Sequence, residues 1–320
     1  MNRLCELLQI GVPIIQGGMG NISHPQLTAA ISNAGALGTI GAGTMSPDEV
    51  EAKIIRTKEL TVRPFALNIA ITVSPYTKEL IELVLKHEVP VISLSAGNPA
   101  SYVEYLHHHS VKVIAVVGAV KHAKKAEAGG ADVIVGEGYE AAGINSPLET
   151  TTLALIPQLV DAVHVPVVAA GGIADGRGMA ASFALGAEGV QMGTRFIATK
   201  EAPFSDIYKQ RLIDANDNET VVIGRSVKRI RRVLKNPYVK EILESETAGM
   251  TLDTFNELTN EDHHILGAVE GNEESGYWNS GQISGLIRQV PSVGELIANM
   301  VNEMNLVVNK LQTYKANSIK

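Results

Sequence analysis

Cysteine, aromatic residues and long apolar runs are all scarce in this chain of 320 residues. The single cysteine, Cys5, excludes an internal disulfide framework and is typical of a reducing compartment. No run of about 18 apolar residues is present, and the N-terminal segment lacks a signal-peptide core, so we expect a cytoplasmic protein without a membrane span. Aromatic residues make up 4% of the chain and its formal net charge is -7, so the composition does not favour nucleic-acid binding.

The chain is rich instead in short apolar runs that alternate with stretches of helical periodicity. Hydrophobic residues make up 45% of it, enough for a large core. The runs predict parallel strands, buried on both faces, over 12–16, 37–41, 65–70, 91–97, 112–118, 132–138, 166–172 and 189–196. Helices are predicted over 25–34, 47–60, 76–87, 120–129, 151–163 and 175–186. This alternation predicts a (β/α)8 TIM barrel, with an open doubly wound sheet as the alternative.

The pattern changes after residue 197. We predict a mostly helical subdomain without strands over 201–275, inserted in a barrel made of 1–200 and 276–320, whose outer ring a last helix over 293–314 would close. The segment RSVKRIRRVLK (225–235) predicts an amphipathic helix with a basic face. Such a face is either simply solvated, or docks an acidic acyl carrier protein or the phosphates of NADPH or coenzyme A.

Glycines follow several of the predicted strands. Gly171 and Gly172 follow the seventh strand, and Gly193 and Thr194 belong to the end of the eighth. In a TIM barrel these two loops often bind a phosphate through main-chain N–H groups, which a Cβ would obstruct. Ordinary turn glycines are the alternative. The Thr194 hydroxyl would be a further donor.

Other small residues gather at the same predicted rim, in QGGMG (16–20), GAG (41–43) and GEG (136–138). They leave space for a flat ring across the barrel mouth, with the amides of Gln16, Asn68 and Gln191 beside it. FMN has such a ring and one phosphate, but a phosphorylated sugar fits this spacing nearly as well.

Two groups of histidines, 107–109 and 263–264, do not have the spacing of about four residues that places two ligands on one helix face. We therefore interpret both groups as solvated and predict no metal site.

Eight ordered segments then give a resemblance to a known family: PIIQGGMG, AGALGTIGAG, FALNI, SAGNP, GADVIVGEGYEAAG, VPVVAAGGIADGRG, ALGAEGVQMGTRF and SGQISGLI. The chain resembles the family of nitronate monooxygenases, once called 2-nitropropane dioxygenases, and flavin-dependent enoyl-acyl-carrier-protein reductases. The resemblance implies a barrel with noncovalent FMN, reduced in some members by NAD(P)H. By position it implies a phosphate site at Gly171, Gly172, Gly193 and Thr194. The rest of the cofactor would lie near Gly17, Gly18, Met19, Asn68, Glu137, Gly143, Gln191, Met192, Gly281 and Gln282.

One position departs from the family. Many members have a histidine, the usual acid or base beside the flavin, where this chain has Ile144. No catalytic residue is therefore assigned. Asn145 is a candidate replacement beside Ser146, Tyr139 and Tyr277, and for each of the four a structural role is the alternative.

Three functions remain open at this stage. The first is an FMN oxidoreductase that takes hydride from NAD(P)H and reduces an enoyl thioester or a quinone. The second is a nitronate monooxygenase, and the third is a noncatalytic FMN-binding protein. The expected partners are a small-molecule or acyl-thioester substrate, an acyl carrier protein and a second copy of the chain, with neither nucleic acid nor membrane among them.

Overall fold

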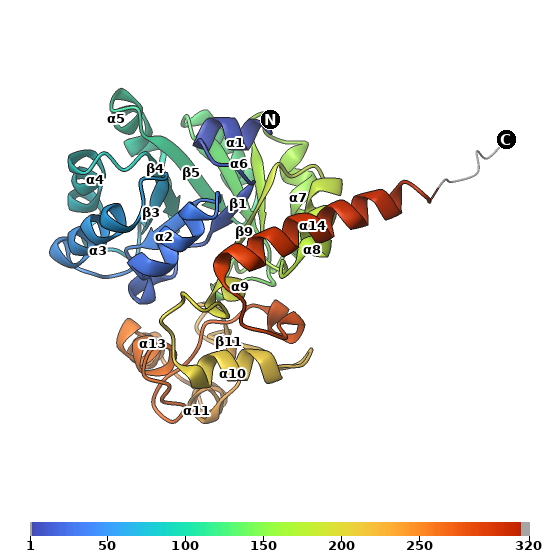
Figure 1. Ribbon diagram of the computed structural model, residues 1–320. Helices are drawn as coiled ribbons and strands as arrows, with labels where there is room; N and C mark the ends of the chain where they lie inside the picture. Colours follow the sequence, from blue (N-terminus) through green and yellow to red (C-terminus); the bar gives the residue numbers. More distant parts are fainter. Residues whose placement is uncertain (1, 315–320) are drawn as a thin grey trace.

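Eight parallel strands form a barrel in the computed structural model, which describes residues 2–314 (Figure 1). The strands are β1 (Ile14–Gln16), β2 (Gly38–Gly41), β3 (Phe65–Ala70), β4 (Val91–Ser95), β5 (Lys112–Val117), β6 (Val133–Glu137), β8 (Val167–Ala170) and β9 (Gly189–Met192). They pair in the order β1-β9-β8-β6-β5-β4-β3-β2. A parallel bridge between Ile15 and Leu37 joins the two end strands. The predicted barrel is therefore confirmed, and the open sheet is wrong.

Helices surround this barrel. They are α2 (Pro25–Asn33), α3 (Pro47–Leu60), α4 (Thr77–Lys86), α5 (Ala100–His108), α6 (Val120–Ala128), α7 (Thr152–Val160), α8 (Gly176–Ala184) and α14 (Val293–Leu311), the last of which packs against α8 and α2. Gly176 allows the close approach of α8 and α14, because a Cβ there would lie 2.5 Å from the carbonyl oxygen of Met300. Within the described residues, no helix is long and apolar enough to cross a membrane.

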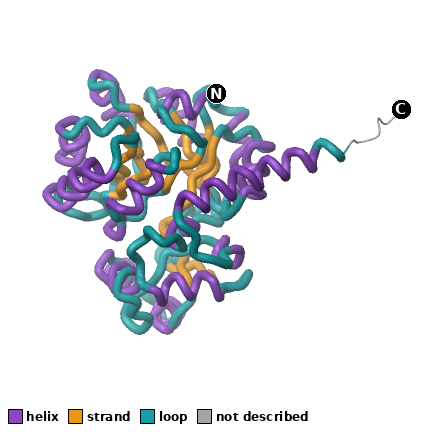
Figure 2. The backbone as a smooth tube through the Cα atoms, in the orientation of Figure 1, coloured by secondary structure: helices purple, strands orange, loops and turns teal. Residues whose placement is uncertain are grey.

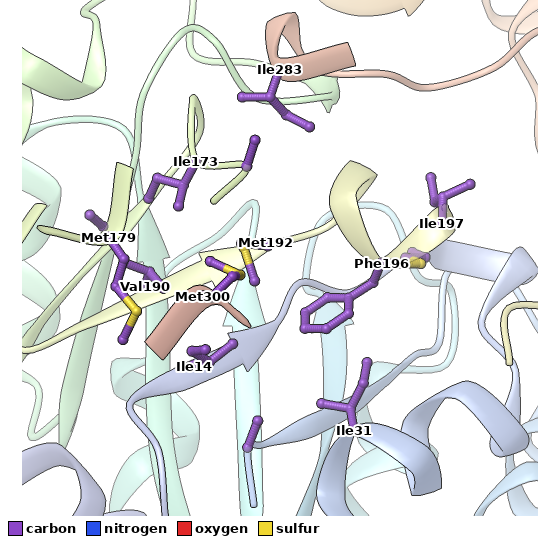
Figure 3. Close-up of a cluster of buried hydrophobic side chains, with 14 of the residues drawn as sticks. Ile14, Ile31, Ile173, Met179, Val190, Met192, Phe196, Ile197, Ile283 and Met300 are labelled. Atoms are coloured by element: carbon purple, nitrogen blue, oxygen red, sulfur yellow. The ribbon is translucent and has the colours of Figure 1, made fainter. Parts of the chain in front are cut away.

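The core has an inner and an outer part. Outside the barrel, Ile14, Val190 and Met192 of β1 and β9 are buried with Ile31 of α2 and Met300 of α14 (Figure 3).

Inside the barrel, Leu4 and Leu8 of α1 (Arg3–Leu8) belong to one buried cluster with Val91 and Val133, the first residues of β4 and β6. Helix α1 therefore packs at the end of the barrel opposite the carboxyl ends of the strands.

A second lobe lies beside the barrel mouth (Figures 1 and 2). In the sequence it comes between α9 (Thr194–Ile197) and η2 (Gln282–Leu286). It contains α10 (Asp206–Asp214), β10 (Thr220–Ile223), β11 (Arg231–Leu234), α11 (Pro237–Thr247), α12 (Leu252–Leu258) and α13 (Glu261–Ala268). Strand β11 pairs on one side with β10 and on the other with β7 (Gly143–Ile144), which comes from the loop after β6. The lobe therefore contains strands, so the prediction of a subdomain without strands is wrong. The division into a barrel of 1–200 and 276–320 and a subdomain of 201–275 stays a prediction.

The basic segment 225–235 is a turn followed by β11, so the predicted amphipathic helix is wrong. Pairing with β10 and β7 decides its conformation, and these partners are distant in the sequence. Arg232 is buried, and its Nε donates to the carbonyl oxygen of Tyr139 at 3.1 Å. Four basic residues of the segment remain exposed: Arg225, Lys228, Arg229 and Lys235.

Candidate active site

A cavity of about 690 Å³ opens at the carboxyl ends of the barrel strands. Its size lies within the range of small-molecule sites, roughly 300–1,000 Å³. All but one of the residues that the family resemblance assigns to the cofactor line it: Gly17, Gly18, Met19, Asn68, Glu137, Gly143, Gly171, Gly172, Gln191, Met192, Gly193, Thr194 and Gly281. Gln282 is the exception, because its side chain is exposed and it does not line the cavity.

The turn after β8 requires glycine for conformational reasons. Gly171 and Gly172 have φ values of 92° and 75°, and a Cβ on Gly171 would lie 2.9 Å from the carbonyl oxygen of Gly138. Thr152 holds the turn from behind, since its hydroxyl donates to the carbonyl oxygen of Gly171 at 2.9 Å. Within residues 2–314, the amides of Gly172 and Ile173 find no acceptor. The turn therefore presents two free N–H donors.

Gly193 differs from these turn glycines. Its φ of -111° is open to any residue, and a Cβ there would meet no atom within 4 Å. Among residues 2–314, apart from its two chain neighbours, no group therefore fills the space in front of Gly193. The Thr194 hydroxyl accepts a hydrogen bond from the amide of Gly281 at 2.9 Å, which ties the C-terminal segment to this side of the cavity and leaves the hydroxyl proton free to donate.

Another part of the mouth is formed by the loops after β1, which neighbours β9 in the barrel, and after β3. Asn68 packs directly on Gly18, where a Cβ would lie 2.2 Å from the Asn68 Oδ1. The Asn68 Nδ2 donates to the carbonyl oxygen of Ser93 at 3.2 Å, so its amide is fixed.

Gln16, expected beside a bound ring, lies fully buried and outside the cavity lining. Its Oε1 accepts from the Thr39 amide at 2.9 Å, so it does not present its amide to a ligand. The prediction that Gln16 lies beside a bound ring is therefore wrong, whereas Gln191 does line the cavity.

Glu137 ends β6 and faces the cavity without a hydrogen bond or ion pair to its carboxyl in the part of the chain that the structure describes. Burial raises the pKa of Glu137 to about 7. A carboxyl of this kind changes its charge near neutral pH, and such groups cluster at functional sites.

The loop after β6 carries position 144, where the family resemblance leads us to expect a histidine. Ile144 lies in β7, lines the cavity and is 56% exposed, but it has no proton to transfer. Asn145, the candidate replacement, donates through its Nδ2 to the carbonyl oxygens of Ala141 and Gly143, both at 3.0 Å. Both protons of this amide are thus used to hold the loop.

The two tyrosines considered as replacements do not line the cavity. The hydroxyl of Tyr139 accepts from Arg225, and the guanidinium of Arg232 lies 4.6 Å from the centre of its ring. Tyr277 is fully buried, its hydroxyl donates to the carbonyl oxygen of Thr259 at 2.9 Å, and burial raises its pKa. Of the four side chains considered, Asn145 and Ser146 line the cavity.

His264 is a cavity residue that the sequence does not indicate. The prediction that it is solvated is wrong, because it is 3% exposed and lines the cavity from α13, together with Glu261, Arg231 and Asn279. Helix α13 packs against η1 (Gly20–Ile22), which brings residues 240 positions apart to the same wall. The local signal was the i, i+3 spacing of Glu261 and His264, which puts both side chains on one helix face.

Comparisons with known proteins agree with this geometry. The sequence model of a family described as nitronate monooxygenase matches residues 1–79 and 69–303. The structure of FabK from Thermotoga maritima shares 39% identity, covers 98% of this chain and 99% of its own, and superposes with a TM-score of 0.93. Nitroalkane oxidase from Streptomyces ansochromogenes shares 25% identity at a TM-score of 0.85, over 96% and 99% of the two chains.

Curated relatives are similar over the same extent. A probable nitronate monooxygenase of Staphylococcus saprophyticus is 33% identical over an alignment of 355 positions that covers 96% of this chain and 99% of the relative. A (3aS,4S,5R,7aS)-5-hydroxy-7a-methyl-1-oxo-octahydro-1H-indene-4-carboxyl-CoA dehydrogenase of Rhodococcus jostii is 33% identical and covers 98% of each chain. Because the family match and these relatives span nearly all of the chain, it belongs to the nitronate monooxygenase family, and it is an oxidoreductase of this flavin-dependent group.

Proposed function

We propose that this protein is an FMN-dependent oxidoreductase that takes hydride from NAD(P)H and reduces an electrophilic acceptor, either an enoyl thioester or a quinone. FMN, when bound, supplies the hydride chemistry. The protein supplies binding, orientation and the surrounding charges. The observation that carries the proposal is the cavity rim, where main-chain donors, an open space in front of Gly193 and a wall made of small residues line the same cavity.

The residues present fit this cofactor. The free amides of Gly172 and Ile173 and the hydroxyl of Thr194 would bind its phosphate, and the space in front of Gly193 would receive it. Main-chain N–H groups suit an anion because they present positive partial charge without a flexible side chain.

The wall formed by the loops after β1 and β3 suits the ring. Gly17, Gly18 and Met19 bring main chain rather than bulky polar groups to this side. The fixed amide of Asn68 and the side chain of Gln191 add donors and acceptors for a polar heterocycle.

Reduction of a thioester is supported by the relatives. FabK, at 39% identity, belongs to the enoyl-reductase branch that the sequence resembles, and the Rhodococcus jostii relative is named for a carboxyl-CoA substrate. Arg229 stays exposed in the turn before β11. We propose that it contributes to docking the acidic acyl carrier protein or the phosphates of coenzyme A.

A nitronate monooxygenase is the second candidate, and Ile144 favours it. A neutral nitroalkane must lose a proton before oxidation, whereas an ionised nitronate needs no base at position 144. The curated Staphylococcus relatives carry this name.

Anaerobic stopped-flow spectroscopy tests the proposal. The protein carrying FMN is mixed with NADH, NADPH or an alkyl nitronate, and the visible flavin absorbance is followed. Bleaching by NADH or NADPH, followed by recovery with crotonyl-CoA or a quinone, supports the proposed function. Bleaching by the nitronate alone supports the second candidate. No bleaching with any of them would point to a noncatalytic FMN-binding protein.

A further inference from the structure

One wall of the cavity holds a buried histidine that the proposed function does not yet use. His264 is 3% exposed and comes from α13 of the second lobe. Its ring stacks on Tyr277, with the ring centres 5.3 Å apart and the planes at 13°. The stacking fixes the plane of the imidazole. A histidine lining a ligand cavity is well suited to proton transfer near neutral pH.

A carboxylate orients this ring from behind. The Nδ1 of His264 lies 3.4 Å from the Oε2 of Glu261. Burial alone would raise the pKa of Glu261, but the hydrogen bond from His264, the charge of Arg231 and the amide of Asn21 hold it below its ordinary value. Glu261 is therefore ionised and keeps a proton on Nδ1, which leaves Nε2 as the exchanging nitrogen.

The other ring nitrogen faces an amide that suits both protonation states. The Nε2 of His264 lies 3.3 Å from the Nδ2 of Asn279, whose Oδ1 is buried and has no partner among residues 2–314. The Nδ2 serves as a donor to the neutral ring. Turning the amide by about 180° puts the Oδ1 in its place, where it accepts from a protonated ring. The neutral and the protonated ring of His264 thus each have a hydrogen-bond partner in the amide of Asn279.

The same amide connects His264 to the loop after β6. A Cβ on Gly143 would lie 3.6 Å from the Cγ of Asn279, and the main chain of Asn279 is fixed by a hydrogen bond of 2.8 Å from the Tyr208 hydroxyl to its carbonyl oxygen. His264 and Ile144 line the same cavity. Arg231 is a further charged group on this wall; its guanidinium lies 5.2 Å from the centre of the Tyr277 ring, which stacks on His264.

We propose that His264 is the proton-transfer residue of this cavity, with Glu261 as the positioning residue that orients it. The inference rests on the proposed function. In the reduction of an enoyl thioester, hydride from NAD(P)H forms the C–H bond at the β-carbon, and the electron pair of the C=C bond takes a proton at the α-carbon. For this step the amide of Asn279 gives up its 3.3 Å contact with Nε2. The Nε2–H bond of protonated His264 then breaks to supply that proton to the substrate, and solvent restores it.

Variants of two neighbouring histidines test the proposal in the protein carrying FMN. His264→Gln removes the proton donor, and His263→Gln is the matched control, because His263 packs on Tyr238 and does not line the cavity. After reduction with NAD(P)H, His264→Gln should reduce crotonyl-CoA about 10² to 10⁴ times more slowly than the wild type. Reduction of ferricyanide, which needs no proton at carbon, should be unchanged. His263→Gln should leave both rates unchanged, and a wild-type crotonyl-CoA rate in His264→Gln would overturn the proposal.

A second measurement is independent of substrate and of NAD(P)H. Long-range ¹H–¹⁵N correlation of histidine-labelled protein reports which ring nitrogen of neutral His264 carries the proton. The proton is expected on Nδ1 in the wild type, and this preference should be lost in Glu261→Ala. A proton on Nε2 in the wild type, or an unchanged preference in Glu261→Ala, would overturn the orientation by Glu261. If the wild type itself does not reduce crotonyl-CoA, the proposed function fails. The tautomer measurement then still tests whether Glu261 orients the ring of His264.

Discussion

Glu137→Gln should remove a pH dependence from the stability of this protein. Burial raises the pKa of the Glu137 carboxyl from 4.5 to about 7 in the folded chain. The folded state therefore holds a proton that the unfolded state has already lost between these two values. The resulting stabilisation is fully present below the unfolded pKa and is lost as the pH rises through about 7. The difference between the two pKa values corresponds to about 3 kcal/mol.

Urea unfolding of flavin-stripped protein measures this effect. Between about pH 4.5 and pH 8, the free energy of unfolding of the wild type should fall by about 3 kcal/mol relative to Glu137→Gln, because glutamine stays neutral throughout. Glu257→Gln, at an exposed carboxylate of α12, is the matched control and should keep the wild-type pH dependence. Parallel curves for the wild type and Glu137→Gln would refute the reasoning, since they would mean that the carboxyl is solvated in the folded state.

Three further substitutions test other parts of the account. Gly193→Val should fill the open space and weaken FMN binding, measured by fluorescence titration, at least about tenfold, or 1.4 kcal/mol. Gly294→Val, at an equally open glycine outside the cavity, is the control and should leave the affinity for FMN unchanged. Ser292→Ala removes the capping box of α14 and should lower the free energy of unfolding in urea by about 1 kcal/mol; an unchanged value would show that the cap contributes nothing. Arg229→Glu should raise the KM for an enoyl substrate on acyl carrier protein and leave quinone reduction unchanged, and equal KM values for variant and wild type would remove the docking role.

The barrel was predictable because its signals are local. Each strand is a short apolar run, and the predicted helices have helical periodicity; at α3, Ser46 and Glu49 also form a capping box. The main error within the barrel lies at the last strand, which ends at Met192 because α9 begins at Thr194.

The second lobe was less predictable because its sheet depends on distant pairing. Strand β7 has two residues, too few for any periodic signal, and it exists because Ile144 and Gly143 pair with Arg231 and Arg232 of β11. The same pairing turns a segment with helical spacing into a strand.

The candidate site divides in the same way. Rim glycines such as Gly171 and Gly172 could be assigned from their position after a strand, which the barrel topology brings to the mouth. His264 could not, because its entry into the cavity depends on α13 packing against η1, a contact between residues far apart in the chain. Gln282 shows the opposite error, since it follows Gly281 in the sequence but its side chain is exposed.

Equilibrium titration of flavin-stripped protein with FMN is the most direct test of the central claim, which is that the main chain at the barrel mouth binds this cofactor. The account predicts one FMN per chain, a yellow protein, release of FMN on unfolding, and weaker binding by Gly193→Val. A colourless protein that does not bind added FMN would contradict it.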